Sequence, residues 1–410
     1  MSYIRSSESV FSGQVASSIA LPTVEQFVLA ARPEEPIYCL RPAAITEAAS
    51  EFVRGFHGDV LYAVKCNPEP AVLKALWEGG VRHFDCASAG EIALVHQILP
   101  EAAIHFMHPV KSRPAIRAAY ARFGVRDFVL DSAGELAKIM DETGNAADLG
   151  LVVRLALPPS GAIYDLSGKF GASVEEAAAL LRAARPLAFR LGLSFHVGSQ
   201  CMEPLAYRRA LALVADTMRR AGVTVDIIDV GGGFPVSYPD LEPPPLGAFF
   251  AEIEAAFEAL DLPAAKLWSE PGRALVAAGA SVVVQVQLRR GDALYVNDGV
   301  YGSLSDAGAP AFRFPVRRIR GTLTGGEIEV SRAYTFFGPT CDSADHMKGP
   351  FTLPADMAEG DWIEIGQLGA YGACLGTVFN GFDRPQLLEV SDAPMLGNAS
   401  HDPGPLRLAA

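Results

Sequence analysis

Eight short apolar runs alternate with longer segments of helical period between about residues 40 and 275, and this alternation limits the possible fold more than any other feature. It is typical of repeated βα units on a parallel sheet. The predicted strands are residues 61–64, 83–84, 104–107, 127–130, 151–155, 193–195, 226–230 and 266–269, with helical stretches such as 91–99, 174–184, 205–220 and 249–260 between them. Eight such units indicate an α/β fold in the form of a closed (β/α)8 barrel, which needs about 250 residues.

The pattern changes after Val276. Residues 281–288, 293–297, 317–323, 327–333 and 362–366 are predicted strands separated by glycine-rich turns, with little helical period. We therefore expect a barrel domain at 40–275 and an all-β domain at 276–410. Residues 1–39 contain an amphipathic stretch, 24–31, and a candidate strand, 37–40, which could pack on either domain. We expect them to join the all-β domain.

Charge and composition exclude several classes of protein. The chain of 410 residues has 34 basic and 47 acidic side chains, a net charge of −13, and half of its residues are hydrophobic, as in a soluble globular protein. An acidic chain repels a phosphate backbone, so nucleic acid is not an expected partner. The most apolar stretch, 274–288, is interrupted by Gly279, Ser281 and Gln285, so no membrane span is expected.

The cysteines and the first residues of the chain indicate a compartment. The six cysteines, Cys39, Cys66, Cys86, Cys201, Cys341 and Cys374, form no Cys-x-x-Cys motif, which argues against a zinc ribbon and a disulfide framework. Polar residues interrupt any apolar segment near the N-terminus, so no secretory signal is predicted. The predicted location is the cytoplasm.

Polar residues stand at the ends of most of the predicted barrel strands. Lys65 follows 61–64, Asp85 follows 83–84, Arg154 lies within 151–155, His196 follows 193–195, Gly231–Gly233 follow 226–230 and Glu270 follows 266–269. Barrel enzymes carry their active sites at the carboxyl ends of the strands, because all of these ends meet at one face. These side chains are therefore predicted to converge on one site.

Lys65 is the most informative of these residues. A lysine at the end of an apolar strand is costly to desolvate as a cation and is expected to prefer the neutral form, which can form a Schiff base. The alternative is a surface lysine whose stem lies along apolar residues. Because other polar residues are predicted at the same face, we favour the Schiff base.

The last two strands are followed by groups that suit an anion. Gly231, Gly232 and Gly233 offer backbone N–H groups, and Arg273, in Pro271-Gly272-Arg273, adds a guanidinium. Loops after the seventh and eighth strands are where barrels often bind phosphate. A tight turn is the alternative explanation of the three glycines.

Two further residues suit a flat heterocycle. Glu270 could bond to a protonated ring nitrogen, or it could pair with Arg273. His196 could stack on a ring, or it could be a core histidine. His105 and His108 lie three positions apart, on alternate faces of the predicted strand, with no adjacent carboxylate, so no metal site is predicted. An amine, a phosphate site, an acid and a stacked histidine together describe a pyridoxal phosphate site.

The sequence also resembles a known family in seven motifs, in order, from about Pro36 to Phe382. These are Tyr62-Ala-Val-Lys65-Cys-Asn67, Phe84-Asp85-Cys-Ala-Ser88, Phe195-His196-Val-Gly-Ser199-Gln200, Asp229-Val-Gly231-Gly-Gly-Phe-Pro235, Glu270-Pro-Gly-Arg273, Gly338-Pro-Thr-Cys341-Asp342-Ser-Ala-Asp345, and Gly369-Ala-Tyr371 with Phe379-Asn-Gly-Phe382. They resemble the fold-type III pyridoxal phosphate decarboxylases, specifically the ornithine decarboxylase branch.

The resemblance implies a role for each matching residue around pyridoxal 5'-phosphate. Lys65 would form the Schiff base, Glu270 would face the pyridine nitrogen, and His196 would stack on the ring. The remaining cofactor-binding residues would be Asp85 and Arg154 near the ring substituents, and Ser199, Gly231, Gly232, Gly233, Gly272, Arg273 and Tyr371 around the phosphate.

The resemblance also implies a homodimer with shared active sites and a basic amino acid as substrate. Cys341 of the partner subunit would act on the intermediate after CO2 leaves, and Asp342 of the partner subunit would bind the distal amine, with Tyr301 and Phe379 also predicted to contact substrate. The implied reaction is the conversion of L-ornithine to putrescine, a step of polyamine biosynthesis. Related diaminopimelate decarboxylases usually carry Cys-Glu-Ser-Gly, whereas this chain has Cys341-Asp-Ser-Ala, which favours a plain diamine product.

One departure leaves the substrate open. Ornithine decarboxylases carry a second aspartate that holds the distal amine, and the corresponding stretch here, Ala307-Gly-Ala-Pro310, has none; Asp306 is out of register. Lysine, diaminopimelate or another specialised amino acid is therefore the alternative substrate. A racemase is less favoured because racemases do not carry the Cys341-Asp342 motif, and a catalytically silent regulator is less favoured because the cofactor residues are present.

Overall fold

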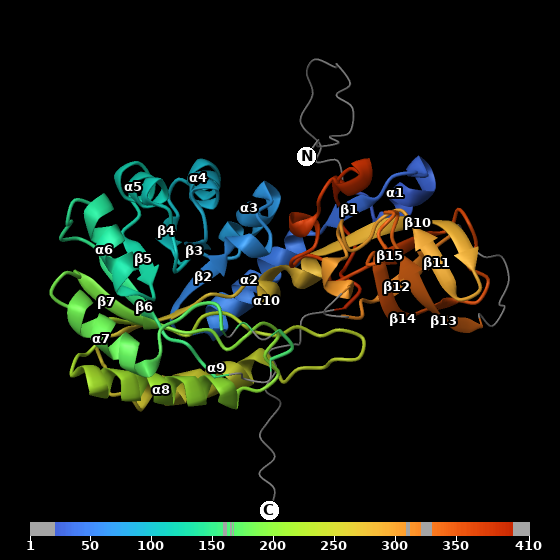
Figure 1. Cartoon of the computed structure of the whole chain (residues 1–410). Coiled ribbons are helices and arrows are strands. Elements are labelled where there is room, and N and C mark those ends of the chain that lie inside the picture. The colour runs from blue at the N-terminus through green and yellow to red at the C-terminus, as the bar shows by residue number, and fades with distance from the viewer. Residues whose placement is uncertain are drawn as a thin grey trace, which may run out of the picture. The chain divides into compact units, whose positions relative to one another are not determined.

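The structure is a computed structural model that describes residues 21–158, 162–164, 166, 168–308, 312–320 and 330–396. The chain divides into two compact units (Figure 1). The barrel unit contains Thr46–Val236 and Pro243–Leu275. The all-β unit contains the described residues up to Ile45, together with Ser237–Glu242 and those from Val276 onward.

The barrel unit is built on a closed parallel barrel of eight strands among the described residues, as the alternating pattern predicted. The strands are β2 (Asp59–Ala63), β3 (His83–Cys86), β4 (Ala103–Phe106), β5 (Asp127–Leu130), β6 (Gly150–Arg154), β7 (Arg190–Ser194), β8 (Ile227–Asp229) and β9 (Lys266–Ser269). Branched and aromatic side chains in these runs are buried on both faces, which explains why the runs are almost continuously apolar. The second strand, predicted at 83–84 only, has four residues.

Helices follow the strands, and several begin at a serine. The helices are α2 (Pro42–Gly55), α3 (Pro70–Glu78), α4 (Ala89–Ile98), α5 (Arg113–Ala121), α6 (Ala133–Glu142), α7 (Val174–Ala184), α8 (Leu205–Ala221), α9 (Leu246–Glu258) and α10 (Arg273–Val276). Ser88, Ser112, Ser132 and Ser173 each accept a hydrogen bond from a backbone N–H of the first turn of the following helix. This cap satisfies a donor that has no partner within the helix and fixes where each helix begins.

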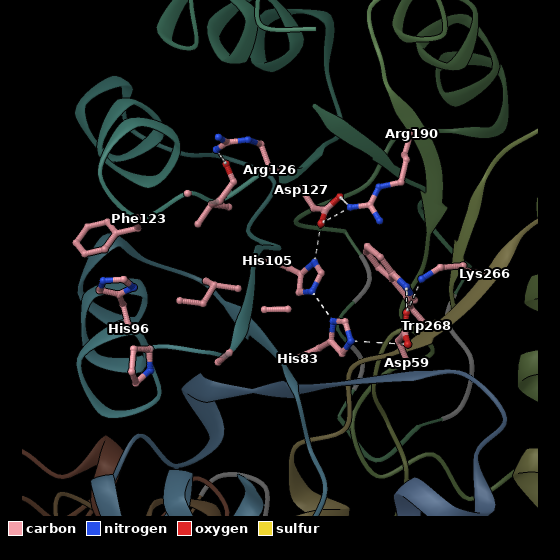
Figure 2. A pocket seen from close by; sticks show the side chains of 16 residues that line it. Asp59, His83, His96, His105, Phe123, Arg126, Asp127, Arg190, Lys266 and Trp268 are labelled. Atoms are coloured by element: carbon pink, nitrogen blue, oxygen red, sulfur yellow. Dashed lines mark hydrogen bonds and ion pairs between the residues drawn. The ribbon is translucent and has the colours of Figure 1, made fainter. Parts of the chain in front are cut away.

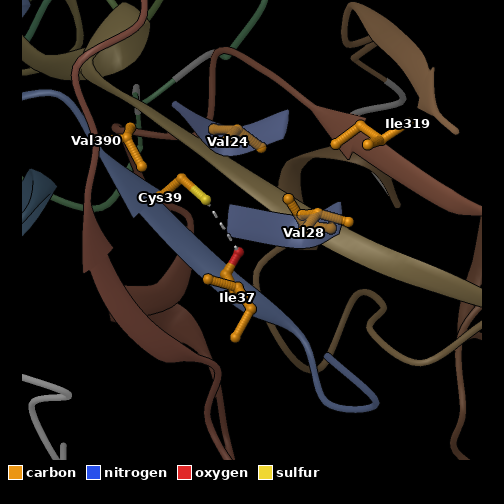
Figure 3. Packing of buried hydrophobic residues seen from close by; sticks show 7 residues of the cluster. Val24, Val28, Ile37, Cys39, Ile319 and Val390 are labelled. Carbon is orange, nitrogen blue, oxygen red and sulfur yellow. Dashed lines mark hydrogen bonds between the residues drawn. The ribbon is translucent and has the colours of Figure 1, made fainter. Parts of the chain in front are cut away.

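The all-β unit contains a mixed sheet with the strand order β12-β15-β10-β11-β13-β14, in which β1 pairs with β10 and β16. The strands are β1 (Ile37–Leu40), β10 (Ala280–Arg290), β11 (Ala293–Val296), β12 (Val316–Ile319), β13 (Ser331–Phe337), β14 (His346–Pro354), β15 (Trp362–Ile365) and β16 (Gln386–Glu389). Helix α1 (Val24–Ala31) places Val24 and Val28 on the sheet against Ile37, Cys39 and Ile319 (Figure 3).

Some sequence predictions for this unit need correction. The sequence did not predict β14 and β16. It predicted a strand at 317–323, but β12 ends at Ile319, and residues 321–323 lie outside the described residues. The strand predicted at 327–333 also begins outside the described residues, and β13 runs from Ser331 to Phe337.

The amino-terminal ends of the barrel strands carry a network of ionisable side chains (Figure 2). Lys266 Nζ lies 3.7 Å from Asp59 Oδ2, and Asp59 Oδ1 lies 3.7 Å from His83 Nε2. His83 Nδ1 is 3.0 Å from His105 Nε2. His105 Nδ1 is 3.0 Å from Asp127 Oδ2.

Arg190 completes the network, with its guanidinium 2.8 Å from Asp127 Oδ1. The six side chains line a cavity of about 340 Å³ and link six of the barrel strands. This cavity lies at the end of the barrel opposite to the one at which Lys65 and Glu270 follow their strands, so it is separate from the predicted active site.

The His83–His105 pair of this network should make the barrel less stable in mild acid. Burial and the neighbouring His105 lower the pKa of His83 to about 4, against about 6.5 in an unfolded chain. The unfolded state therefore binds more protons between pH 6.5 and 4, and the free energy of unfolding falls as the pH falls through this range. His83→Gln should remove up to about 3 kcal/mol of this fall, measured by urea unfolding at pH 7 and 4.

A matched control is His57→Gln, because the His57 side chain is 77% exposed. This variant should keep the pH dependence of the wild-type protein. An unchanged pH dependence in His83→Gln would contradict the assignment.

Candidate active site

Lys65 and Asp85 form an ion pair at the carboxyl end of the barrel. Lys65 lies in the short helix η1 (Val64–Cys66) directly after β2, and Asp85 lies in β3 opposite Ala63. Lys65 Nζ is 2.5 Å from Asp85 Oδ2. The predicted desolvation of Lys65 is not seen in this structure, because the side chain is 44% exposed and pairs with the buried Asp85 carboxylate.

The three glycines after β8 form a tight loop against the loop after β7. Gly231 and Gly233 have φ of +67° and +106°, and a Cβ at Gly231 would lie 2.2 Å from the Phe195 carbonyl oxygen, so both positions require glycine. The Tyr207 hydroxyl donates to the Gly232 carbonyl at 2.9 Å. Within the described part of the chain, the Gly231 N–H donates to Asp229 Oδ1, whereas the N–H groups of Gly232 and Gly233 donate to no protein acceptor. Gly232 and Gly233, rather than Gly231, therefore offer N–H groups to an anion.

His196 is a neutral histidine next to this loop. Burial, reinforced by the charges of Arg154 and Lys65, lowers its pKa to about 3. Its Nδ1 accepts a hydrogen bond from the Gly198 N–H at 3.0 Å, which places the ring proton on Nε2. The ring is packed against Gly232, where a Cβ would lie 3.2 Å from Nε2. The residue thus offers an uncharged flat surface.

Glu270 follows β9 and is 8% exposed. Its N–H donates to the Gly231 carbonyl at 2.8 Å, which joins it to the glycine loop. Burial and the nearby carboxylates of Asp229 and Asp85 raise its pKa well above the usual range. Arg273, at the start of α10, is also buried.

The other predicted residues of the barrel unit lie on the same end. Arg154 is the last residue of β6 and pairs with Ser194 of β7 in the barrel. Ser199 forms a two-way backbone bridge with Tyr164. Gly272 packs tightly, with a Cβ there lying 3.0 Å from Cys66 Cβ, so its observed role is to let the chain pass close to the turn that carries Lys65.

The predicted residues of the all-β unit form a second cluster within that unit. The Tyr301 hydroxyl donates to Asp342 Oδ2 at 2.5 Å, and the rings of Tyr301 and Phe379 lie 5.0 Å apart. The Ala344 N–H and the Tyr301 hydroxyl lower the pKa of Asp342, so this carboxylate stays charged. The Cys341 thiol is exposed, and Cys341 and Asp342 line a cavity of about 630 Å³.

Tyr371 and the stretch from Ala307 to Pro310 are the remaining predicted features of this unit. Tyr371 has a φ of +53° and its carbonyl accepts a hydrogen bond from Ser305 at 3.1 Å. In the stretch without a second aspartate, Ala307 is buried and Pro310 lies outside the described residues.

Three residues that shape the barrel site were not predicted from the sequence. Asp229 holds the Gly231 N–H and contacts Glu270, Tyr207 holds Gly232, and Gln200 exchanges two hydrogen bonds with the backbone of Val236. Asp229 and Gln200 belong to the quoted motifs, so a signal was present for them. Tyr207 looks like any other helical core residue in the sequence.

Among the described residues, no helix is long and apolar enough to cross a membrane. The same residues contain no group of three or more histidine, cysteine, aspartate or glutamate side chains placed to hold a metal ion.

The chain is similar in sequence to known enzymes. Residues 43–277 match the family model described as pyridoxal-dependent decarboxylase, pyridoxal binding domain. The chain is 33% identical over 352 residues to a lysine/ornithine decarboxylase of Selenomonas ruminantium, covering 82% of this chain and 84% of that protein. It is also 33% identical over 365 residues to mouse (Mus musculus) ornithine decarboxylase, covering 82% and 76%.

Solved structures similar to this chain are also decarboxylases. An arginine decarboxylase of Paramecium bursaria Chlorella virus has a TM-score of 0.80 at 27% identity, over 90% of this chain and 99% of that one. A lysine/ornithine decarboxylase of Vibrio vulnificus, in complex with cadaverine, has a TM-score of 0.77 at 31% identity, over 90% and 95%.

Proposed function

The chain belongs to the pyridoxal-dependent decarboxylases, and on this premise we propose that it decarboxylates L-ornithine, or a close basic analogue, to the corresponding diamine. The observation that carries the proposal is the charged Asp342 carboxylate, which lies beside Cys341 and Tyr301 in a cavity of the all-β unit. A carboxylate held in this way suits the distal ammonium of a basic substrate. For ornithine, the products are putrescine and CO2.

The residues of the barrel unit fit pyridoxal phosphate. We assign Lys65 as the amine that bonds to the aldehyde carbon, Glu270 as the partner of the pyridine nitrogen, and His196 as the residue stacked on the ring. The phosphate group is assigned to Ser199, Gly232, Gly233 and Arg273, with Gly231 and Gly272 giving the backbone its close approach. When bound, the cofactor withdraws the electron pair left at Cα as CO2 departs.

The protein's own groups prepare this chemistry. The Asp85 carboxylate pairs with the Lys65 amine and holds it in the direction of the site. Arg154 adds positive charge to the same end of the barrel, and the neutral His196 adds none. The resemblance assigns Asp85 and Arg154 to the ring substituents and adds Tyr371, from the all-β unit, to the phosphate ligands.

We assign Cys341 and Asp342 to the active site of a second subunit, so that the functional unit is a homodimer. Cys341 supplies an exposed thiol for protonation of the product carbon, and Tyr301 and Phe379 contact the substrate beside Asp342. A putrescine-forming activity would place the protein in polyamine synthesis in the cytoplasm. Decarboxylation of lysine, diaminopimelate or another specialised amino acid is the second candidate, because the stretch from Ala307 to Pro310 has no second aspartate.

The test is to load the purified protein with pyridoxal phosphate and measure CO2 and diamine formed from L-ornithine, L-lysine and meso-diaminopimelate. We expect putrescine from ornithine. Asp342→Asn should raise KM for ornithine about tenfold to a hundredfold, because a charge-assisted hydrogen bond to the distal amine is lost. The exposed Asp383→Asn is the matched control and should leave KM unchanged.

Two results would change the proposal. Silence on ornithine together with turnover of another amino acid would move the assignment to that substrate. An Asp342→Asn variant with unchanged KM for every substrate would remove Asp342 from the substrate site.

A further inference from the structure

Two carboxyl groups meet at the carboxyl ends of β8 and β9. Asp229 is the last residue of β8 and pairs with Trp268 in β9, and the backbone ladder continues through the bond from the Glu270 N–H to the Gly231 carbonyl. Asp229 is fully buried and Glu270 is 8% exposed. The register of these two strands therefore fixes the two acids side by side.

The two oxygens of Asp229 have different surroundings. Oδ1 accepts the Gly231 N–H at 2.8 Å. Oδ2 is buried and has no hydrogen-bond donor among the described residues, and the neighbouring side chain that interacts with Asp229 is the Glu270 carboxyl. Two carboxyl oxygens can form a hydrogen bond only when a proton lies between them.

The charges around the pair also favour retention of one proton. Asp85 from β3 adds another negative charge, whereas Lys65 from η1 and Arg154 from β6 add positive ones, and His196 after β7 is neutral. Burial raises the pKa of Asp229 to about 6 and that of Glu270 well above its usual range. Because the Gly231 N–H stabilises the Asp229 anion, the proton of the pair lies on Glu270 before the cofactor binds.

We infer that Asp229 is the positioning residue for Glu270: the two share one proton, and Asp229 takes this proton when Glu270 ionises against the ring nitrogen of the cofactor. The Glu270 O–H bond breaks and the Asp229 O–H bond forms, with no change in electron count. Protonated Asp229 then donates to the Glu270 carboxylate and still accepts from Gly231. The inference rests on the proposed placement of Glu270 at the ring nitrogen.

This arrangement has two consequences for cofactor binding. The pair presents one net negative charge to a protonated ring instead of two, which suits a single ring cation in a buried site. Asp229 also connects the carboxylate that faces the ring to the glycine loop assigned to the phosphate. Both ends of the cofactor would thus be held by one side chain through its two oxygens.

Infrared difference spectra of the wild-type protein, with and without ¹³C in the aspartate side-chain carboxyls, test the shared proton. At pH 7 the cofactor-free protein should show a protonated carboxyl band that the label does not shift and that both Glu270→Gln and Asp229→Asn remove. After loading with pyridoxal phosphate, a protonated carboxyl band should remain, and the ¹³C label on aspartate should now shift it, because the proton lies on Asp229. Asp298, whose pKa burial raises to about 6, contributes equally to all samples and cancels.

The spectra distinguish failure of the inference from failure of the proposed function. A band that disappears on loading, or that never responds to the label, would overturn the transfer to Asp229. If Glu270→Gln changes neither the affinity for pyridoxal phosphate nor the absorbance of the bound cofactor, the placement of Glu270 itself fails. The spectrum of the cofactor-free protein still tests the pair in that case.

Cofactor affinity gives a second measurement through matched variants. Asp229→Asn should bind pyridoxal phosphate within about threefold of wild type, because its amide can donate to Glu270 and its carbonyl can accept from Gly231. Asp229→Leu should bind about tenfold to a hundredfold more weakly, because both contacts are lost in a buried site. The exposed Asp261→Asn is the control. Equal losses in the Asn and Leu variants would show that the site needs an aspartate anion and would overturn the inference.

Discussion

Lys65→Ala should abolish turnover, with a loss of at least about a thousandfold, and should prevent borohydride from fixing pyridoxal phosphate to the protein. The expected loss is large because Lys65 is the amine assigned to the cofactor, and its ion pair with Asp85 shows that the fold directs this amine to the end of the barrel where the other assigned residues lie. Turnover is measured as CO2 release, and the fixed cofactor is located by peptide mass spectrometry.

Lys74→Ala is the matched control for this variant. Lys74 lies exposed in α3, and its removal should change neither turnover nor cofactor fixation. Near wild-type turnover in Lys65→Ala would remove Lys65 from the reaction. Fixation at another lysine in the wild-type protein would also contradict the assignment.

Mixing two inactive variants should restore activity if active sites are shared between subunits. Lys65→Ala and Cys341→Ala are each expected to be inactive, but a mixed dimer has one site in which both residues are intact. Random exchange makes half of the dimers mixed, and each has one intact site of two, so about a quarter of wild-type activity should return. The measurement is the decarboxylation rate after exchange, with differently tagged subunits to count mixed dimers.

The double variant Lys65→Ala/Cys341→Ala provides the control for the mixing experiment. Mixed with Cys341→Ala, it produces no site with both residues intact, so no activity should return. Absence of recovery in the main experiment, despite a measured population of mixed dimers, would place Cys341 and Lys65 in sites that are not shared.

The barrel could be predicted from the sequence because its strands are buried on both faces. Such strands read as short apolar runs, and the polar residue that ends each run lies at the carboxyl rim in any closed parallel barrel. For this reason the sequence alone predicts that Lys65, Asp85, His196 and Glu270 lie at one end of the barrel. The strand β14 gave no such signal, since it contains Lys348 and Pro350, and proline is unusual within a strand.

The electrostatic state of the site could not be predicted in the same way. The apolar run before Lys65, taken by itself, predicts a desolvated, neutral amine. The register of β2 and β3 places Asp85 opposite Ala63, within reach of the amine, and the resulting ion pair does not follow from that run. The contact between Asp229 and Glu270 depends likewise on the register of β8 and β9.

The sequence by itself determined the order of the barrel units and which residue types end the strands, because these depend on local patterns of burial along the chain. Only the tertiary structure decided which ionisable groups meet. These are Lys65 with Asp85, Asp229 with Glu270, and the network of side chains that links Lys266 to Arg190 at the opposite end of the barrel. The reason is that an interaction between two charges depends on a separation of a few ångströms, which the alignment of neighbouring strands sets and a single strand does not contain.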